Sequence, residues 1–107
     1  MSKIYVFDLD GTICSVTNGN YKEATPIQSR ISIINRLYIE GNVIYIYTAR
    51  GMGTFNNQAD LALEKWERIT LTQLGLWGVR YNKLFMGKPA GDLYVDDKAM
   101  LNKDFFK

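Results

Sequence analysis

The sequence contains no histidine, a single cysteine and only two prolines. The absence of histidine excludes Ser-His-Asp and Cys-His catalysis, and it excludes every zinc site that depends on imidazole. With Cys14 alone, no disulfide can form within the chain, and we expect this residue to be a small buried side chain rather than a nucleophile. Any chemistry must therefore depend on carboxylates, Lys, Arg, Thr, Tyr or this one thiol.

The sequence also lacks long apolar runs and clusters of basic residues. Its 13 basic and 11 acidic residues give a formal net charge of +2, which is too balanced for nucleic-acid binding. The apolar stretch near the N-terminus is short and ends in acid, a pattern typical of neither a signal peptide nor a membrane span. We therefore expect a cytoplasmic protein that binds neither nucleic acid nor membrane.

Short apolar runs alternate with helical patterns along the 107 residues, a length that suits one domain spanning residues 1–107. The runs predict buried strands at residues 4–7, 43–47, 83–86 and 93–95. Apolar spacing predicts one helix from Thr25, as N-cap with Gln28 in a capping box, to a C-terminal Gly41, and another over residues 58–74. The order predicts an α/β fold: a Rossmann-like three-layer sandwich with a mainly parallel sheet.

Polar residues follow each predicted strand. They are Asp8 and Asp10 after the first, Thr48 and nearby Arg50 after the second, Lys88 after the third, and Asp96 and Asp97 after the fourth. Because parallel strands end at the same edge of a sheet, we expect these side chains to converge. Four carboxylates in one cleft repel one another unless a cation intervenes, and all-oxygen ligation favours Mg²⁺. Thr48 and Lys88 can then hold a phosphoryl group.

The spacing of Asp8 and Asp10 supplies two catalytic roles. A carboxylate can attack phosphorus to form an aspartyl-phosphate that water hydrolyses. A second carboxylate two residues further on returns to the same face of an extended chain. It can protonate the leaving oxygen and later activate the water. This pattern predicts a phosphoric monoester hydrolase.

The motifs resemble those of the haloacid dehalogenase (HAD) superfamily. Residues 8–12 (Asp-Leu-Asp-Gly-Thr) resemble its first motif, Thr48 its second, Lys88 its third and residues 94–97 its fourth. The resemblance spans about residues 3 to 98, and the order of the motifs along the chain is that of the superfamily. Residues 48–51, 87–89 and 96–99 further resemble small capless members, some of which are associated with capsule or surface-polysaccharide biosynthesis.

The resemblance implies a role for each matching residue. Asp8 is expected to be the nucleophile and a metal ligand, and Asp10 the general acid/base that binds Mg²⁺ through its backbone carbonyl. Asp96 is expected to bind the metal directly, and Asp97 through water or by holding Lys88. The catalytic set is Asp8, Asp10, Thr48 and Lys88, and the residues expected around the substrate phosphate are Gly11, Thr12, Thr48, Ala49, Arg50 and Lys88.

Two residue assignments stay open at this point. Asp92 replaces Asp97 in the metal shell if the fourth motif is read as Gly-Asp-x-x-x-Asp, although Asp92 would then begin the strand at the wrong edge of the sheet. Arg50 either contacts the substrate phosphate or forms a structural ion pair.

The connections after the first and second strands are too short for a cap domain. We therefore expect an open site, which a second subunit of a homo-oligomer can cover. Residues 18–21 and 52–55 are the only local lids that the sequence offers.

The leading hypothesis is a Mg²⁺-dependent phosphatase acting on a small phosphorylated metabolite, such as a sugar phosphate. The alternatives are a phosphatase for a macromolecule (a nucleic-acid end or a phosphoprotein) and a non-catalytic phospho-binding or regulatory module. A signalling receiver domain combines similar residues, but there the acid pair comes on the first strand, whereas here it comes last.

Overall fold

A three-stranded parallel sheet forms the centre of the computed structural model, which describes residues 2–107. The strands are β1 (Ile4–Asp8), β2 (Val43–Thr48) and β3 (Lys83–Met86), and they lie in the order β1-β2-β3. Runs of β-branched and aromatic residues suit the pleated, half-buried surface of such strands. Because both neighbouring pairs are parallel, the three carboxyl ends meet at one edge, as the sequence predicted.

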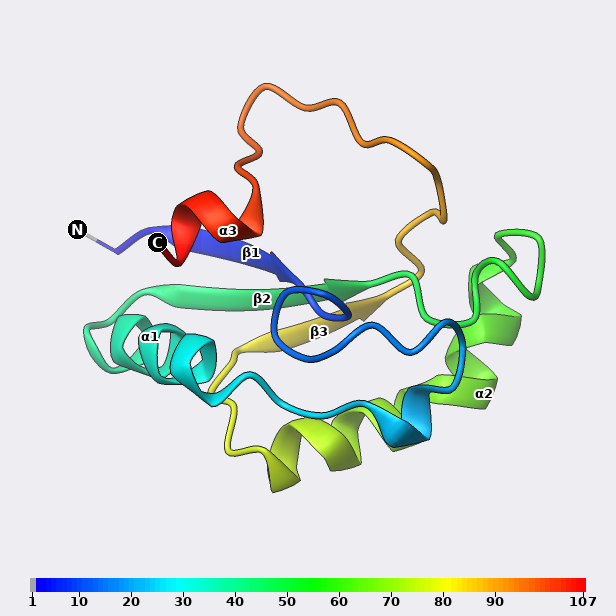
Figure 1. Ribbon diagram of the computed structural model, residues 1–107, viewed down its shortest axis with the longest axis horizontal. Coiled ribbons are helices and arrows are strands. Elements are labelled where there is room, and N and C mark those ends of the chain that lie inside the picture. The colour runs from blue at the N-terminus through cyan, green and yellow to red at the C-terminus, as the bar shows by residue number, and fades with distance from the viewer. Residues whose placement is uncertain (1) are drawn as a thin grey trace.

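Two long helices connect the strands (Figure 1). Helix α1 (Gln28–Ile39) lies between β1 and β2, and α2 (Ala59–Leu76) lies between β2 and β3. A 3-10 turn, η1 (Tyr21–Glu23), precedes α1, and the short α3 (Asn102–Phe105) lies beside β1. The second helix runs two residues beyond its predicted end. The predicted α/β class and the parallel sheet are confirmed, and residues 2–107 form no separate cap domain.

The core lies between the sheet and the two long helices. Ile31 and Ile34 of α1 and Leu74 of α2 form one buried cluster with Ile44 and Ile46 of β2. Leu74, near the C-terminal end of α2, is fully buried. Since these side chains share one face of β2, both helices cover the same face of the sheet.

The opposite face of the sheet carries aromatic side chains. Tyr45 and Tyr47 of β2 alternate with the buried isoleucines and are half-buried. The ring of Phe85 on β3 packs edge-to-face against both, with centroids 5.1 Å and 6.3 Å away. Val6 on β1 shares this face and is 58% exposed.

The prediction of a fourth strand at residues 93–95 is wrong. Leu93 and Val95 are 80% and 89% exposed, and this segment pairs with no strand among the described residues. The Tyr94 hydroxyl accepts a hydrogen bond from Gly91 N and donates one to Pro89 O, at 3.0 and 2.7 Å. This local turn takes the place of strand pairing for residues 93–95. We call residues 89–101, which include this turn, the arch; Figure 1 shows it in orange beyond β1.

The predicted capping box at the start of α1 is also wrong. The helix begins at Gln28, and Ile27 precedes it without a side-chain cap. Thr25 instead pairs with Ser15: the Thr25 N–H donates to Ser15 Oγ and the Ser15 N–H donates to Thr25 O, each at 2.9 Å. Because the helix begins only at Gln28, Thr25 lies outside it, and these two long-range bonds tie the Thr25 backbone to Ser15 instead. The predicted Gly41 does end the helix, in a left-handed conformation with φ of 96°.

Within residues 2–107, no helix is both long and apolar enough to cross a membrane.

Candidate active site

The loop after β1 is a tight turn that fixes Asp8 and Asp10. The carbonyl oxygen of the buried Leu9 accepts hydrogen bonds from the N–H groups of Thr12, Ile13 and Cys14 at 2.8 to 3.3 Å. Gly11 has a φ of 86°, a conformation that favours glycine, and its N–H donates to Cys14 O at 2.8 Å. The turn therefore fixes Asp8 as the last residue of β1 and Asp10 two residues further along the chain.

Lys88 lies beside Asp8, although 80 residues separate the two in sequence. Its backbone N–H donates to Thr48 O at 3.0 Å, which joins the chain after β3 to the end of β2. Its Nζ then approaches Asp8 Oδ1 to 3.4 Å and lies 4.2 Å from the centroid of the Tyr94 ring. The convergence of the first and third strand ends, which the sequence predicted, is therefore present.

The carboxyl group of Asp8 is half-buried. Burial raises its pKa above the ordinary value of 3.8, and the Lys88 ammonium and the Leu9 N–H counteract only part of that effect. The site therefore leaves some of the negative charge on Asp8 uncompensated. Additional positive charge near the Asp8 carboxylate, from a metal ion or from a hydrogen-bond donor on a ligand, would stabilise its charged form.

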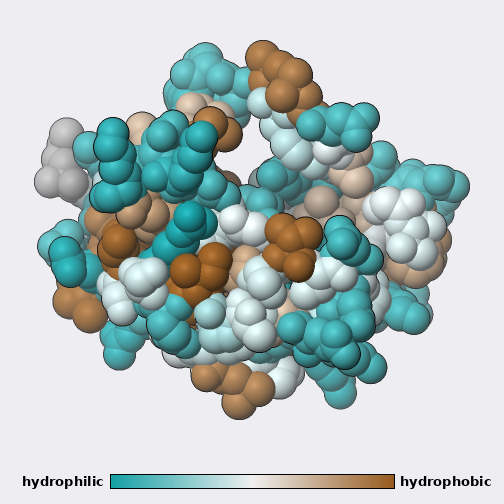
Figure 2. Space-filling model, viewed as in Figure 1, coloured by the Kyte–Doolittle hydropathy of each residue, from teal (hydrophilic) through white to brown (hydrophobic). Residues whose placement is uncertain are grey.

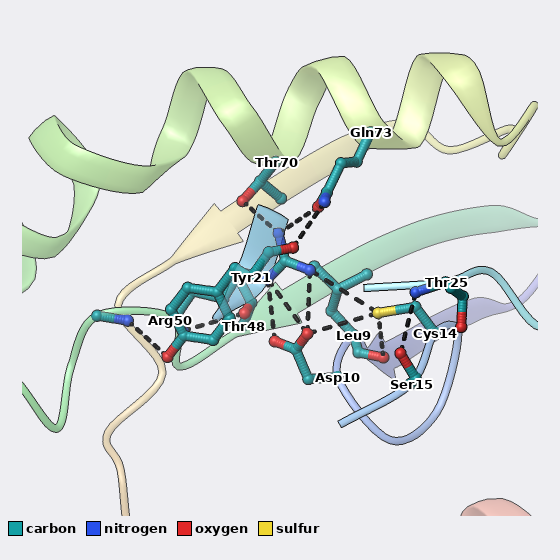
Figure 3. Close-up of polar contacts among 11 residues, drawn as sticks. Leu9, Asp10, Cys14, Ser15, Tyr21, Thr25, Thr48, Arg50, Thr70 and Gln73 are labelled. Atoms are coloured by element: carbon teal, nitrogen blue, oxygen red, sulfur yellow. Dashed lines mark hydrogen bonds and ion pairs between the residues drawn. The ribbon is translucent and has the colours of Figure 1, made fainter. Parts of the chain in front are cut away.

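Asp10 forms an ion pair with Arg50, which Figure 3 shows. Arg50 Nε donates to Asp10 Oδ2 at 3.0 Å and Arg50 Nη2 donates to Asp10 Oδ1 at 3.0 Å, so the contact is bidentate. The Arg50 side chain is fully buried, whereas that of Asp10 remains 21% exposed. Of the two interpretations left open for Arg50, this geometry supports the ion pair.

Thr48 is fully buried and is the last residue of β2. Its Oγ accepts a hydrogen bond from the Arg50 N–H at 3.1 Å. This is the side-chain-to-backbone bond by which threonine stabilises a turn. Thr48 thus positions the backbone of Arg50, and its side chain does not line the cleft described next.

A cleft of about 500 Å³ opens at the carboxyl ends of the strands. Asp8, Asp10 and Lys88 line it, together with Ala49 and Arg50. Its rim comes from residues 16–19, Tyr21 and Gly53, and from residues of the arch. Both segments predicted as local lids therefore contribute to this rim.

Gly11 and Thr12, predicted to contact the substrate phosphate, do not line this cleft. Their N–H groups are engaged within the loop, and Thr12 is 7% exposed. Asn102 of α3 donates through Nδ2 to Gly11 O at 2.7 Å and to Thr12 Oγ at 3.1 Å. These two residues therefore support the turn that carries Asp8.

Asp96 and Asp97 lie on the exposed arch, apart from the other predicted ligands. Asp96 Oδ1 accepts the Lys98 N–H at 3.0 Å, and this bond lowers the pKa of the Asp96 carboxyl. Asp92, the alternative ligand, is also exposed on the arch. Across residues 2–107, no three acidic, cysteine or histidine side chains lie close enough together to hold a metal ion. The expected four-carboxylate centre is therefore not assembled.

A second, larger groove of about 920 Å³ separates the arch from β1. Asp8, Lys88 and Asp96 all line it, together with the exposed edge of β1 and the aromatic side chains of α3. Figure 2 shows the molecule hollowed beneath the arch. Asp8 and Lys88 border both spaces, so this pair lies where the groove and the cleft meet.

The contacts that surround the ion pair of Asp10 and Arg50 were not identified from the sequence. Thr70 and Gln73 on α2 are buried and bind the Arg50 guanidinium, and Cys14 contacts Asp10 through its thiol. A signal for the first two was present, because they interrupt the apolar stripe of α2 at helical spacing. A buried polar pair of this kind requires a polar partner from another part of the chain.

Cys14 is fully buried, as the sequence predicted. Burial and the neighbouring Asp10 raise the pKa of its thiol to about 12. Because the thiolate is the reactive form, this cysteine is not a nucleophile at neutral pH.

Comparison with known proteins gives structural similarity without a function. No protein-family model matches the sequence, and no curated protein matches it. A structural genomics target from Vibrio cholerae, known from its crystal structure, superposes with a TM-score of 0.89 at 28% sequence identity. The match covers 99% of this chain and 88% of that protein. The description of that structure names no activity.

Proposed function

We propose that this chain is a phosphatase of the haloacid dehalogenase type that hydrolyses a small phosphorylated metabolite, such as a sugar phosphate, with Asp8 as the nucleophile. The observation that carries the proposal is the pairing of Asp8 with Lys88 at 3.4 Å beside Asp10, in a cleft at the carboxyl ends of parallel strands. In such sheets ligands bind at this edge. The same residues match the motif order of that superfamily.

The reaction proceeds in two steps. An Asp8 carboxylate oxygen attacks phosphorus, the bond from phosphorus to the ester oxygen breaks, and the Asp10 carboxyl donates a proton to the departing alcohol. Water then attacks the phosphorus of the aspartyl-phosphate, and Asp10 accepts its proton. The bond between Asp8 and phosphorus breaks, which releases inorganic phosphate and restores both carboxyl groups.

Lys88 supplies fixed positive charge to the phosphoryl group. Its ammonium is held in place by the backbone bond to Thr48 and by the contact with the ring of Tyr94. Charge placed in advance near the transferring oxygens lowers the barrier without reorganisation during the reaction. The side chains of Asp8 and Lys88 are 39% and 20% exposed, so the pair is accessible to a substrate.

Asp8 and Asp10 offer oxygen ligands, and they offer as many as a Mg²⁺ site usually takes from a protein. Mg²⁺ usually takes one or two carboxylates and completes its shell with water and substrate phosphate. The incompletely compensated charge of the half-buried Asp8 is consistent with a cation there. The Asp8 carboxylate and the Asp10 carbonyl would hold the ion, while Asp96 lies apart from them on the exposed arch. When bound, Mg²⁺ neutralises charge on the phosphoryl oxygens.

The test is phosphate release from a panel of phosphomonoesters, with and without Mg²⁺. The panel contains sugar phosphates, a nucleotide, a phosphoserine peptide and p-nitrophenyl phosphate. We expect wild type to hydrolyse at least one small ester and Asp8→Asn to lose at least about 10³-fold in kcat. Asp60→Asn, which changes an exposed acid on α2, is the matched control and should retain full activity.

Each other outcome has a definite meaning. If Asp8→Asn retains activity, Asp8 is not the nucleophile and the proposal fails. If only the phosphopeptide is hydrolysed, the substrate is a macromolecule. If wild type and Asp8→Asn are equally inert on every ester, the chain is not a phosphomonoesterase for these substrates and a binding role replaces the proposal.

A further inference from the structure

The Arg50 guanidinium is completely enclosed by its partners, and one of them is the carboxylate of Asp10. Arg50 Nε and Nη2 each lie 3.0 Å from an Asp10 oxygen. Arg50 Nη1 donates to Thr70 Oγ at 3.1 Å and to Gln73 Oε1 at 2.6 Å, and Nη2 also reaches Cys14 Sγ at 3.8 Å. All five N–H donors of the guanidinium thus have acceptors within the protein.

These hydrogen-bond partners come from two separate parts of the chain, as Figure 3 shows. Thr70 and Gln73 lie one turn apart on α2, and Asp10 lies in the loop after β1. Gln73 in turn donates through Nε2 to Tyr21 O at 2.7 Å, and the Tyr21 ring lies against the guanidinium with its centroid 5.0 Å away. The orientation of the Asp10 carboxylate is therefore tied to α2 and to the rim of the cleft.

Burying an ion pair such as Asp10 and Arg50 adds little to the free energy of unfolding. Removing two charges from water costs several kcal/mol per ion, and the mutual attraction of the pair often only offsets that cost. An apolar pair of similar volume would serve the fold as well. What the planar guanidinium adds is geometry, because two parallel N–H groups fix a carboxylate in one plane and one direction.

We infer that Arg50 is the positioning residue of Asp10: it holds the carboxyl group at the edge of the cleft, aimed at the leaving oxygen of the substrate. This inference rests on the proposed function. Proton transfer to a leaving group requires hydrogen-bond distance and alignment, and a displacement of about 1 Å can lower the rate by about 10²-fold. Arg50 itself has no free donor and touches no substrate.

The test compares two esters that differ in their need for a proton donor. p-Nitrophenyl phosphate has a leaving group that departs without protonation, whereas a primary alkyl phosphate does not. The measured quantity is kcat/KM, because it reports only the steps up to release of the alcohol. We expect Arg50→Met to lower kcat/KM for the alkyl ester by about 10²-fold and for p-nitrophenyl phosphate by less than about 5-fold. Arg50→Lys should recover part of the loss, since a single ammonium can hold only one oxygen.

Two further measurements separate positioning from other roles. Inorganic phosphate should inhibit Arg50→Met and wild type with inhibition constants within about 3-fold, because Arg50 does not contact the phosphoryl group. In an Asp10→Asn background, Arg50→Met should change the ratio of the two kcat/KM values no further, since the two residues act as a unit. If Arg50→Met does not fold, Thr70→Val with Gln73→Met removes the support on α2 and should shift the same ratio in the same direction.

Equal losses on both esters would overturn the inference, because they indicate a general structural role. So would a large rise in the inhibition constant of phosphate, which indicates substrate contact, or losses that multiply in the Asp10→Asn background. An inert wild type is a separate result: it refutes the proposed function, and this inference falls with it.

Discussion

Gly51 lies next to Arg50, and replacing it with alanine should destabilise the protein by an amount that the structure allows us to estimate. Its φ is 78°, which raises the free energy of an L-residue by about 1–2 kcal/mol. A Cβ at this position would lie 2.5 Å from Cδ1 of the Trp66 ring and 3.2 Å from the Ala62 Cβ. Forcing extra atoms into such a packed place costs about 1–3 kcal/mol more. The expected loss in free energy of unfolding is therefore about 2–5 kcal/mol.

Gly41 provides the matched control for this substitution. Its φ is 96°, but a Cβ there would meet no atom within 4 Å. Gly41→Ala should thus lose only the conformational part, about 1–2 kcal/mol. Urea unfolding of the three proteins, followed by tryptophan fluorescence and circular dichroism, measures both values. If Gly51→Ala were no less stable than Gly41→Ala, the packing of Trp66 against this loop, and with it our account of the Arg50 turn, would be refuted.

Three further predictions concern the site and the core. Asp8→Asn should raise the Tm above that of wild type at neutral pH without metal, because a raised pKa of Asp8 contributes stability below the unfolded value of 3.8 that is lost as pH rises through the folded value. The difference in Tm between the two proteins should therefore shrink toward pH 3.8. A lower Tm for Asp8→Asn at pH 7 would contradict this. Native Cys14, with a pKa of about 12, should resist iodoacetamide at pH 8 and react only after unfolding, which mass spectrometry can follow. Leu74→Ala should lower the free energy of unfolding by about 2–5 kcal/mol, because Leu74 is buried in the core. Leu76→Ala, at a residue that is 80% exposed on the same helix, should change it by less than about 1 kcal/mol. Equal effects of the two substitutions would place Leu74 outside the core.

The sequence was sufficient to predict the sheet and the place of the site. Strands β1 and β2 combine β-branched and aromatic residues, and β3 is a short apolar run with one aromatic residue. This local signal agrees with the burial found around Ile44 and Ile46. The rule that parallel strands end at one edge then predicted that Asp8 and Lys88 approach one another. Neither inference required knowledge of a particular side-chain contact.

Where the prediction depended on a long-range partner, it was wrong or incomplete. Thr25 has the local pattern of an N-cap, but its bonds to Ser15, ten residues away, determine its conformation. Residues 93–95 have a strand-like composition, but a strand also needs a neighbour, and a local turn around Tyr94 competes with that pairing. The partners of Arg50 are 20 to 40 residues away in sequence, and no local pattern specifies such contacts.

The most direct test of the central claim is to detect phosphate covalently attached to Asp8. Asp10→Asn protein, mixed with p-nitrophenyl phosphate and Mg²⁺ and quenched in acid, should accumulate the intermediate, because the water-activating group is absent while the leaving group departs without a proton. Our account predicts that mass spectrometry finds one added phosphoryl group on the peptide containing Asp8, and none when Asp8 is also replaced by Asn. A phosphoryl group on another residue, or turnover of the ester with no covalent intermediate, would contradict it.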